Sequence, residues 1–292
     1  MKKCNEMKVK EAVSVKVFRA GNTLLLSFLA LLCLYPFWHV CMASFSDSAL
    51  LARNLGLLLR PAGFSTEAYR IVLKEKTLYT GFFNTILLLV IGIPLNMLLT
   101  CMGAYFFSRK NVYFKKPLFL LCLLTMYLHG GTIPFYLTLK DLHLTGSLWG
   151  VILSAALSTY NMIVMKTAFE AIPDSLSDAA RIDGAGHLTI LFKIVLPLSR
   201  ATFAVIAMYY GMSIWNSWFW ASTILQDESS LPLQSVLRNF LIEDAGNEVL
   251  GVAVKETVKY ATIMVSIIPV LFIYPFMQKY FAKGVLVGGV KE

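Results

Sequence analysis

Long apolar runs with few or no charged residues most constrain how this chain of 292 residues can fold. A helix that crosses a bilayer needs roughly 18 or more consecutive, mainly apolar residues. Only 15% of the residues are charged, whereas soluble domains carry about 25%. The sequence therefore predicts an all-α integral membrane protein with about six transmembrane helices, near residues 22–43, 81–107, 117–139, 148–168, 201–222 and 260–281.

Two of these runs carry polar interruptions. The third contains HGGTIP (His129 to Pro134), and the fifth contains SIWNSWFW. Irregular backbone at membrane depth is tolerated only where protein or water satisfies its polar groups. We expect both spans to be discontinuous or to line a cavity.

The distribution of basic residues predicts the orientation. If the N-terminus is cytoplasmic, the inner segments hold 17 of the 26 lysines and arginines, as the positive-inside rule requires. This placement explains the net charge of +9 by a membrane rather than by nucleic acid. The predicted organisation is a cytoplasmic N-terminal segment (1–20), a transmembrane domain (21–282) and a cytoplasmic C-terminal tail (283–292), in a cell membrane with both termini inside.

The two long outer loops each contain an amphipathic stretch. In residues 44–80, Ser65 or Thr66 could cap a short helix. Residues 223–259 contain LPLQSVLRNFLIED. Each stretch is interpreted either as a packed external cap or as a docking surface.

A polar segment interrupts the apolar pattern at DSLSDAARIDGAGHLTILFKIVLP, within a predicted cytoplasmic loop at about 169–200. Asp174 and Ser175 are candidate N-caps, and a cap at Ser175 would place Asp178 in the first turn. Gly184 and Gly186 would end this helix, because glycine adopts positive φ without a Cβ clash. We expect a helix, a glycine turn and a second helix, with a small external face formed by Ala179, Ala180, Gly184 and Ala185. The residues alone leave an ordinary loop as the alternative.

The spacing in this segment resembles the cytoplasmic loop of permeases of ABC importers, which has E-A-A, three residues, G, nine residues, I, one residue and L-P. The corresponding residues here are Asp178, Ala179, Ala180, Gly184, Ile194, Leu196 and Pro197. The one departure is Asp178, which keeps the charge of the usual glutamate on a shorter arm. DGA (Asp183 to Ala185), WNSWFWA and the C-terminal AKGVLVGGVKE resemble the carbohydrate-uptake branch of the family.

This resemblance implies a type I importer permease whose loop forms a coupling helix seated on a cytoplasmic ATPase subunit. The residues carried over to that contact are Asp178, Ala179, Ala180, Asp183, Gly184 and Ala185. The implied partners are a second homologous permease, two ABC ATPase subunits that bind ATP and Mg²⁺, and an extracellular or periplasmic solute-binding protein. The implied solute is an oligosaccharide or a polysaccharide-derived carbohydrate, and the tail from Gly284 to Lys291 would also reach toward the ATPases.

No catalytic or metal site is predicted. The chain lacks GxxxxGK[ST], so ATP hydrolysis is expected in the partner subunits, and its histidines and cysteines lack metal-ligand spacing. For the solute path, aromatic faces and a neutral amide favour Tyr210, Trp215, Asn216 and Trp218; an interfacial aromatic belt is the alternative. Rival functions are import of a peptide or glycerol phosphate, or a membrane scaffold without transport.

Overall fold

The computed structural model describes residues 13–54, 56–110, 112–242, 256–272 and 275. The regular secondary structure of its described part is helical apart from one isolated β-bridge between Ser46 and Phe64. The chain divides into two units, residues 1–73 with 248–265, and residues 74–247 with 266–292. The C-terminal tail and most of the N-terminal segment predicted from sequence lie outside the described residues.

The first unit contains α1 (Val13–Ser44), α2 (Ser48–Arg53), α3 (Glu67–Val72) and the start of a helix over residues 256–272. Thr66 occupies the N-cap position of α3 without a side-chain bond, while Ser65 Oγ accepts a hydrogen bond from the Glu67 amide at 3.3 Å. The Tyr69 hydroxyl lies 2.8 Å from Ser44 Oγ. The outer amphipathic stretch of this unit is therefore packed against the end of α1.

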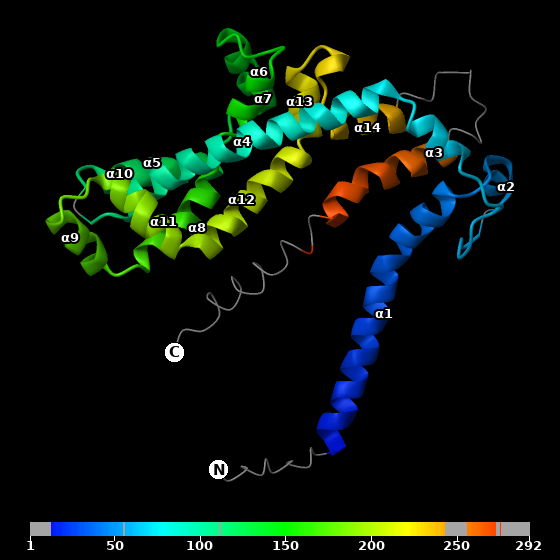
Figure 1. Cartoon of the computed structure of the whole chain (residues 1–292), viewed down its shortest axis with the longest axis horizontal. Coiled ribbons are helices and arrows are strands. Elements are labelled where there is room, and N and C mark those ends of the chain that lie inside the picture. Colours follow the sequence, from blue (N-terminus) through cyan, green and yellow to red (C-terminus); the bar gives the residue numbers. More distant parts are fainter. Residues whose placement is uncertain (1–12, 55, 111, 243–255, 273–274, 276–292) are drawn as a thin grey trace. The chain divides into compact units, whose positions relative to one another are not determined.

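The second unit is built around α4 (Lys76–Ser108), drawn in cyan in Figure 1. The other helices of this unit are α5 (Lys115–Tyr127), α6 (Thr132–Asp141), α7 (Leu148–Ser154), α8 (Thr159–Glu170), α9 (Asp174–Ile182), α10 (His187–Ile190), α11 (Leu196–Leu198), α12 (Arg200–Trp215), α13 (Trp218–Ile224) and α14 (Leu233–Ile242). A π-helical turn at Leu191–Val195 joins α10 to α11, and a 3₁₀ turn at Glu228–Ser230 precedes α14. Helices α8, α12, α14 and α7 all pack on α4.

A hydrophobic core joins α4, α8, the α10 segment and α12. Its fully buried members include Ala104, Met165, Phe169, Ile190 and Ile206. These residues come from four segments that are far apart in sequence. This core fixes the base on which α9 and the following turn sit.

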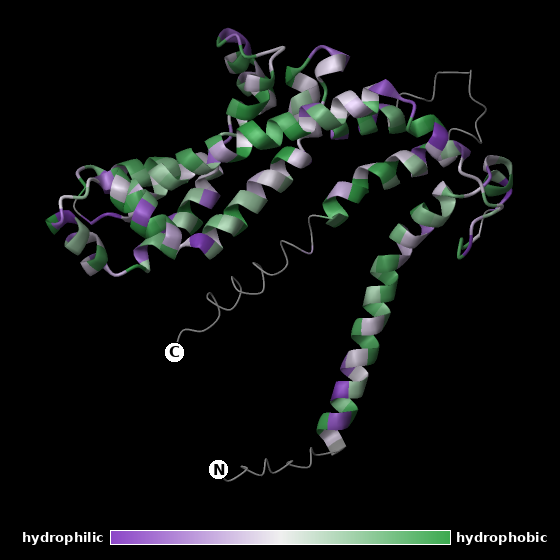
Figure 2. Cartoon of the chain, in the orientation of Figure 1, coloured by the Kyte–Doolittle hydropathy of each residue, from purple (hydrophilic) through white to green (hydrophobic). Residues whose placement is uncertain are grey.

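Five of the six predicted spans have counterparts among the described helices. Two are continuous, Ser14–Ser44 and Lys76–Ser108, and in Figure 2 most of their residues carry the hydrophobic colour. Three more pass the length and hydropathy criteria only as bent pairs: α5 with α6 (118°), α7 with α8 (54°) and the 187–198 segment with α12 (91°). The sixth prediction, 260–281, falls partly outside the described residues, and its described part is helical to residue 272.

The predicted interruption of the third span is confirmed, because α5 ends at Tyr127 and α6 begins at Thr132. The fifth span is also interrupted, between Trp215 and Trp218. The break between α7 and α8 was not predicted. There, Asn96 Nδ2 donates to the Ala155 carbonyl at 3.1 Å, so a side chain of α4 satisfies a backbone group that the broken helix leaves free.

Candidate functional site

Helix α9 begins at Asp174. A cap at Asp174 or Ser175 would have started the helix one or two residues later. Pro173 occupies the N-cap position, and no side chain accepts a hydrogen bond there, so the prediction of a cap by Asp174 or Ser175 is wrong. The physical reason is a competing partner: the carboxylate of Asp174 lies 2.7 Å from Lys110 Nζ. Asp174 still lies in the first turn of α9, where a negative charge suits the helix dipole.

The glycine turn after α9 matches the sequence prediction. Gly184 has a φ of +80°, which a residue with a Cβ adopts only with strain. The Gly184 amide donates to the Arg181 carbonyl at 3.0 Å, and the Ala185 amide donates to the Ala180 carbonyl at 2.9 Å. These two bonds form a Schellman motif, after which Gly186 is the N-cap residue of α10. The predicted helix, glycine turn and second helix are confirmed.

The outward face of this segment differs from the predicted small-residue face. Ala179 and Gly184 are exposed, but Ala180 and Ala185 are half-buried and pack against the hydrophobic core. They share the inward side of the segment with Ser177, which is buried. Sequence reasoning also missed the exposed apolar side chains of Leu176, Ile182 and Leu188, of which Ile182 is 88% exposed.

Asp178 and Asp183 are both exposed. Asp183 is the exposed C-cap residue of α9. Asp178 accepts a hydrogen bond from Arg181 Nη1 at 3.2 Å within the same helix. Its carboxylate therefore forms an exposed i,i+3 ion pair and does not cap α9.

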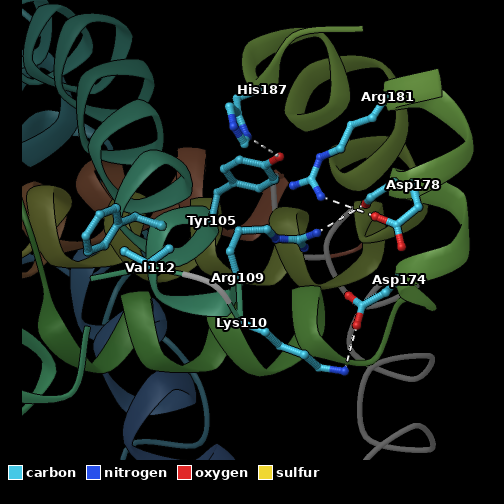
Figure 3. A pocket seen from close by; sticks show the side chains of 10 residues that line it. Tyr105, Arg109, Lys110, Val112, Asp174, Asp178, Arg181 and His187 are labelled. Carbon is cyan, nitrogen blue, oxygen red and sulfur yellow. Dashed lines mark hydrogen bonds and ion pairs between the residues drawn. The ribbon is translucent and has the colours of Figure 1, made fainter. Parts of the chain in front are cut away.

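A cavity of about 560 Å³ lies between the end of α4, α9 and α10. Figure 3 shows Arg109, Lys110, Arg181 and His187 around it, with the carboxylates of Asp174 and Asp178. The cavity thus adjoins the inner side of α9, and its mixed lining has more basic than acidic side chains. Sequence reasoning did not include the residues that α4 and its end contribute to it.

The ion pair of Lys110 and Asp174 keeps both charges over a wide pH range. Its hydrogen bond, then the attraction between the charges, lowers the pKa of Asp174 and raises that of Lys110. The carboxylate contribution to stability is lost only as pH falls through the lowered pKa, and the ammonium contribution only as pH rises through the raised pKa. The pair therefore does not titrate near neutral pH. Both partners are well exposed, so the pair adds little stability.

A second cavity, of about 620 Å³, lies where two helix interruptions meet. Ser154 and Ala155 come from the α7–α8 break, and Asn216 and Ser217 come from the α12–α13 break. Aromatic rings also line it, at Phe219 and Trp220. These polar groups and rings lie among aliphatic side chains such as Val151 and Ile214. Such a lining can hold a polyhydroxylated ligand, since rings cover apolar faces and polar groups fix orientation.

The four residues predicted for the solute path are separated by the structure. Asn216 lines the second cavity. Tyr210 is only 3% exposed; its hydroxyl lies 2.6 Å from Thr100 Oγ1 and accepts a hydrogen bond from the Ser158 amide at 3.0 Å. Trp215 contacts Phe82, and the Arg238 guanidinium lies 4.7 Å from the ring centroid of Trp218. A direct solute contact thus stays a prediction for all four, and the geometry favours Asn216.

Metal-binding chemistry has no candidate cluster in the described part of the chain. No group of three or more His, Cys, Asp or Glu side chains there could hold a metal ion.

Comparison with known proteins gives consistent similarities over nearly the whole chain. Residues 61–287 match the family model described as "Binding-protein-dependent transport system inner membrane component". The polygalacturonan/rhamnogalacturonan transport system permease protein YtcP of Bacillus subtilis (strain 168) is 39% identical, over 90% of this chain and 94% of that protein. The arabinooligosaccharides transport system permease protein AraQ of Halalkalibacterium halodurans is 28% identical, over 91% of this chain and 94% of that protein.

A solved structure matches the fold closely. It belongs to a bacterial ABC transporter involved in the import of the acidic polysaccharide alginate, and the matched chain has a TM-score of 0.88 and 34% identity. The match covers 94% of this chain and all of that chain. A further chain, from an alginate ABC transporter in complex with an alginate pentasaccharide-bound periplasmic protein, has a TM-score of 0.57 at 16% identity and supports the fold alone.

Proposed function

Because the chain belongs to the family of inner membrane components of binding-protein-dependent transport systems, we propose that it is a permease subunit of an ATP-driven carbohydrate importer. The relatives are named for the transport of polygalacturonan or rhamnogalacturonan and of arabinooligosaccharides. These names favour an oligosaccharide or polysaccharide-derived solute over a peptide or glycerol phosphate. They also favour transport over a membrane scaffold.

The observation that carries the coupling role is the exposed face of α9. Ile182 is 88% exposed and Leu176 is 45% exposed, beside charged residues that keep this face polar enough to lie outside the bilayer. Exposed apolar side chains with a polar rim are typical of a surface that another protein covers. We assign that cover to a cytoplasmic ATPase subunit, which would bind ATP and Mg²⁺; this chain would hydrolyse no ATP itself.

The solute would pass the second cavity, beside Asn216 and Trp220. Discontinuous helices commonly form the binding sites of membrane transporters, because freed backbone groups there can meet a solute. A second permease subunit would close the other side of the path, and an external solute-binding protein would deliver the carbohydrate. Both termini of this chain would lie in the cytoplasm.

The experiment tests the glycine turn in the assembled transporter. The chain is co-expressed with candidate ATPase, permease and solute-binding subunits, and we measure co-purification and carbohydrate uptake. A Gly184→Val variant should lower uptake strongly, because a β-branched residue at a φ of +80° costs roughly 1–2 kcal/mol and displaces the turn.

Gly186→Ala is the matched control. Gly186 has a φ of −73°, and a Cβ built there meets nothing within 4 Å, so uptake should stay near wild type. Failure of the wild-type chain to co-purify with any ATPase would contradict the proposed function. Undiminished uptake by Gly184→Val would contradict the coupling role of the turn.

A further inference from the structure

Helix α4 runs past the second cavity, the α7–α8 break and the cavity beside α9. Leu88 lines the second cavity. Farther along, Asn96 supports the α7–α8 break, and Thr100 meets the Tyr210 hydroxyl that accepts a hydrogen bond from Ser158 at the same break. The end of α4 reaches the cavity beside α9. One continuous helix therefore connects the candidate solute cavity with the candidate coupling helix.

Arg109, the residue directly after α4, makes the contact with the inward face of α9. Its Nη1 donates to Ser177 Oγ at 3.1 Å, and Ser177 is only 2% exposed. Its Nε donates to Ser108 Oγ at 3.2 Å, and its guanidinium lies 4.7 Å from the ring centroid of Tyr105. Figure 3 shows this side chain extending from α4 toward α9. Two directed bonds and a ring contact fix the guanidinium in one position.

The same residue joins the neighbouring helix ends. The Arg109 carbonyl accepts a hydrogen bond from Lys115 Nζ at 2.9 Å, and Lys115 Nζ lies 4.0 Å from Glu170 Oε1. Glu170 in turn pairs with Lys166 at 2.8 Å. Through its backbone and side chain, Arg109 thus links α4, α5 and α9, and Glu170 extends the network to α8.

The neighbouring ion pair is a weaker link between α4 and α9. The side chains of Lys110 and Asp174 are 81% and 50% exposed, and water competes for such surface pairs. Ser177, by contrast, is buried, and a charged donor to a buried hydroxyl makes one of the stronger kinds of hydrogen bond. Of these two adjacent basic residues, Arg109 therefore makes the stronger link between α4 and α9, and Lys110 the weaker one.

We infer that Arg109 is the positioning residue that fixes the coupling helix α9 to α4, so that movement of α9 is transmitted to the helix that borders the solute cavity. This inference rests on the proposed function of α9. Arginine is required because its planar group can donate to Ser177 and Ser108 while lying on the Tyr105 ring, which a lysine ammonium cannot do. Without this contact, α9 keeps the packing of Ala180 and Ala185 and the exposed Lys110–Asp174 pair, so its movement reaches α4 less directly.

The test measures ATP hydrolysed per solute imported, using the assembled transporter in proteoliposomes with its solute-binding protein. Arg109→Gln and Arg109→Lys should both raise this ratio by about tenfold, the effect of losing one charge-assisted hydrogen bond. Lys116→Gln removes the same charge from an exposed neighbouring position and should keep the wild-type ratio. A wild-type ratio in Arg109→Gln would overturn the inference, as would full rescue by lysine.

Ser177→Ala tests the same contact from α9 without altering α4. It should raise the ratio. The double variant with Arg109→Gln should have the same ratio as Arg109→Gln alone, because both substitutions remove the same hydrogen bond. Additive effects would overturn the inference. If the wild-type complex shows no solute-stimulated hydrolysis, the proposed function itself fails; if it does and the Arg109 variants match it, only the inference fails.

Discussion

At the scale of single residues, Asn216 and Tyr210 show how similar polar candidates acquire different surroundings. Asn216 is exposed at the α12–α13 break and lines the second cavity. Tyr210 is buried, and its hydroxyl meets Thr100 and the Ser158 amide. The first side chain is available to a solute, whereas the second stabilises the α7–α8 break.

We therefore predict opposite consequences for the two residues. Asn216→Ala should raise the solute concentration needed for half-maximal uptake by about fivefold, the effect of one lost hydrogen bond. It should cost little stability, because the bond from Asn216 Nδ2 to the Met212 carbonyl is exposed to water. Tyr210→Phe should lower the free energy of unfolding by about 1–3 kcal/mol, because the part-buried Ser158 amide loses its acceptor and the buried Thr100 hydroxyl loses its partner. Uptake kinetics and denaturation in detergent measure the two effects. A destabilised Asn216→Ala with unchanged uptake kinetics would count against the assignment of this cavity.

At the scale of elements, α14 is fastened to α4 by polar bonds and close packing. Asn84 Nδ2 donates to the Ser229 and Leu231 carbonyls at 2.9 and 3.1 Å, and Thr85 Oγ1 accepts from the Leu233 amide at 2.8 Å. A Cβ on Gly81 would lie 3.2 Å from Leu233 Cα. The outer amphipathic stretch is thus a packed element, and its buried Leu233, Val236 and Leu237 account for its apolar face.

Gly81→Leu should force α14 away from α4, because the added side chain meets backbone that cannot rotate aside. Hydrogen exchange should become faster over residues 233–242. Gly21→Leu in α1 is the control, since a Cβ there meets nothing within 4 Å. Equal protection of α14 in wild type and Gly81→Leu would refute this account of the packing.

At the scale of the whole molecule, the charge distribution makes a prediction about topology. Most lysines and arginines fall in the segments placed inside, which predicts that residue 116 faces the cytoplasm and residue 227 faces outward. Single cysteines at these two exposed positions, in a variant lacking the five native cysteines, can be labelled with a membrane-impermeant maleimide. Asp227→Cys should react in intact cells, and Lys116→Cys only after permeabilisation. The reverse labelling pattern would show that the chain has the opposite orientation.

The sequence by itself determined the features that depend on local chemistry. Span positions follow from apolar length and charge, and the turn after α9 follows from a glycine that can adopt positive φ. The spacing from Asp178 to Pro197 identified the family before any contact was known. These features involve residues that are close together in the chain.

Only the tertiary structure decided the features that depend on distant residues. Asp174 meets Lys110 instead of capping α9, Ala180 and Ala185 turn toward the core, and Arg109 reaches Ser177. The α7–α8 break likewise depends on Asn96 and Tyr210 from two other helices. Hydrogen-bond partners and buried faces are set by which helices pack together, and no local pattern around these residues contains that information.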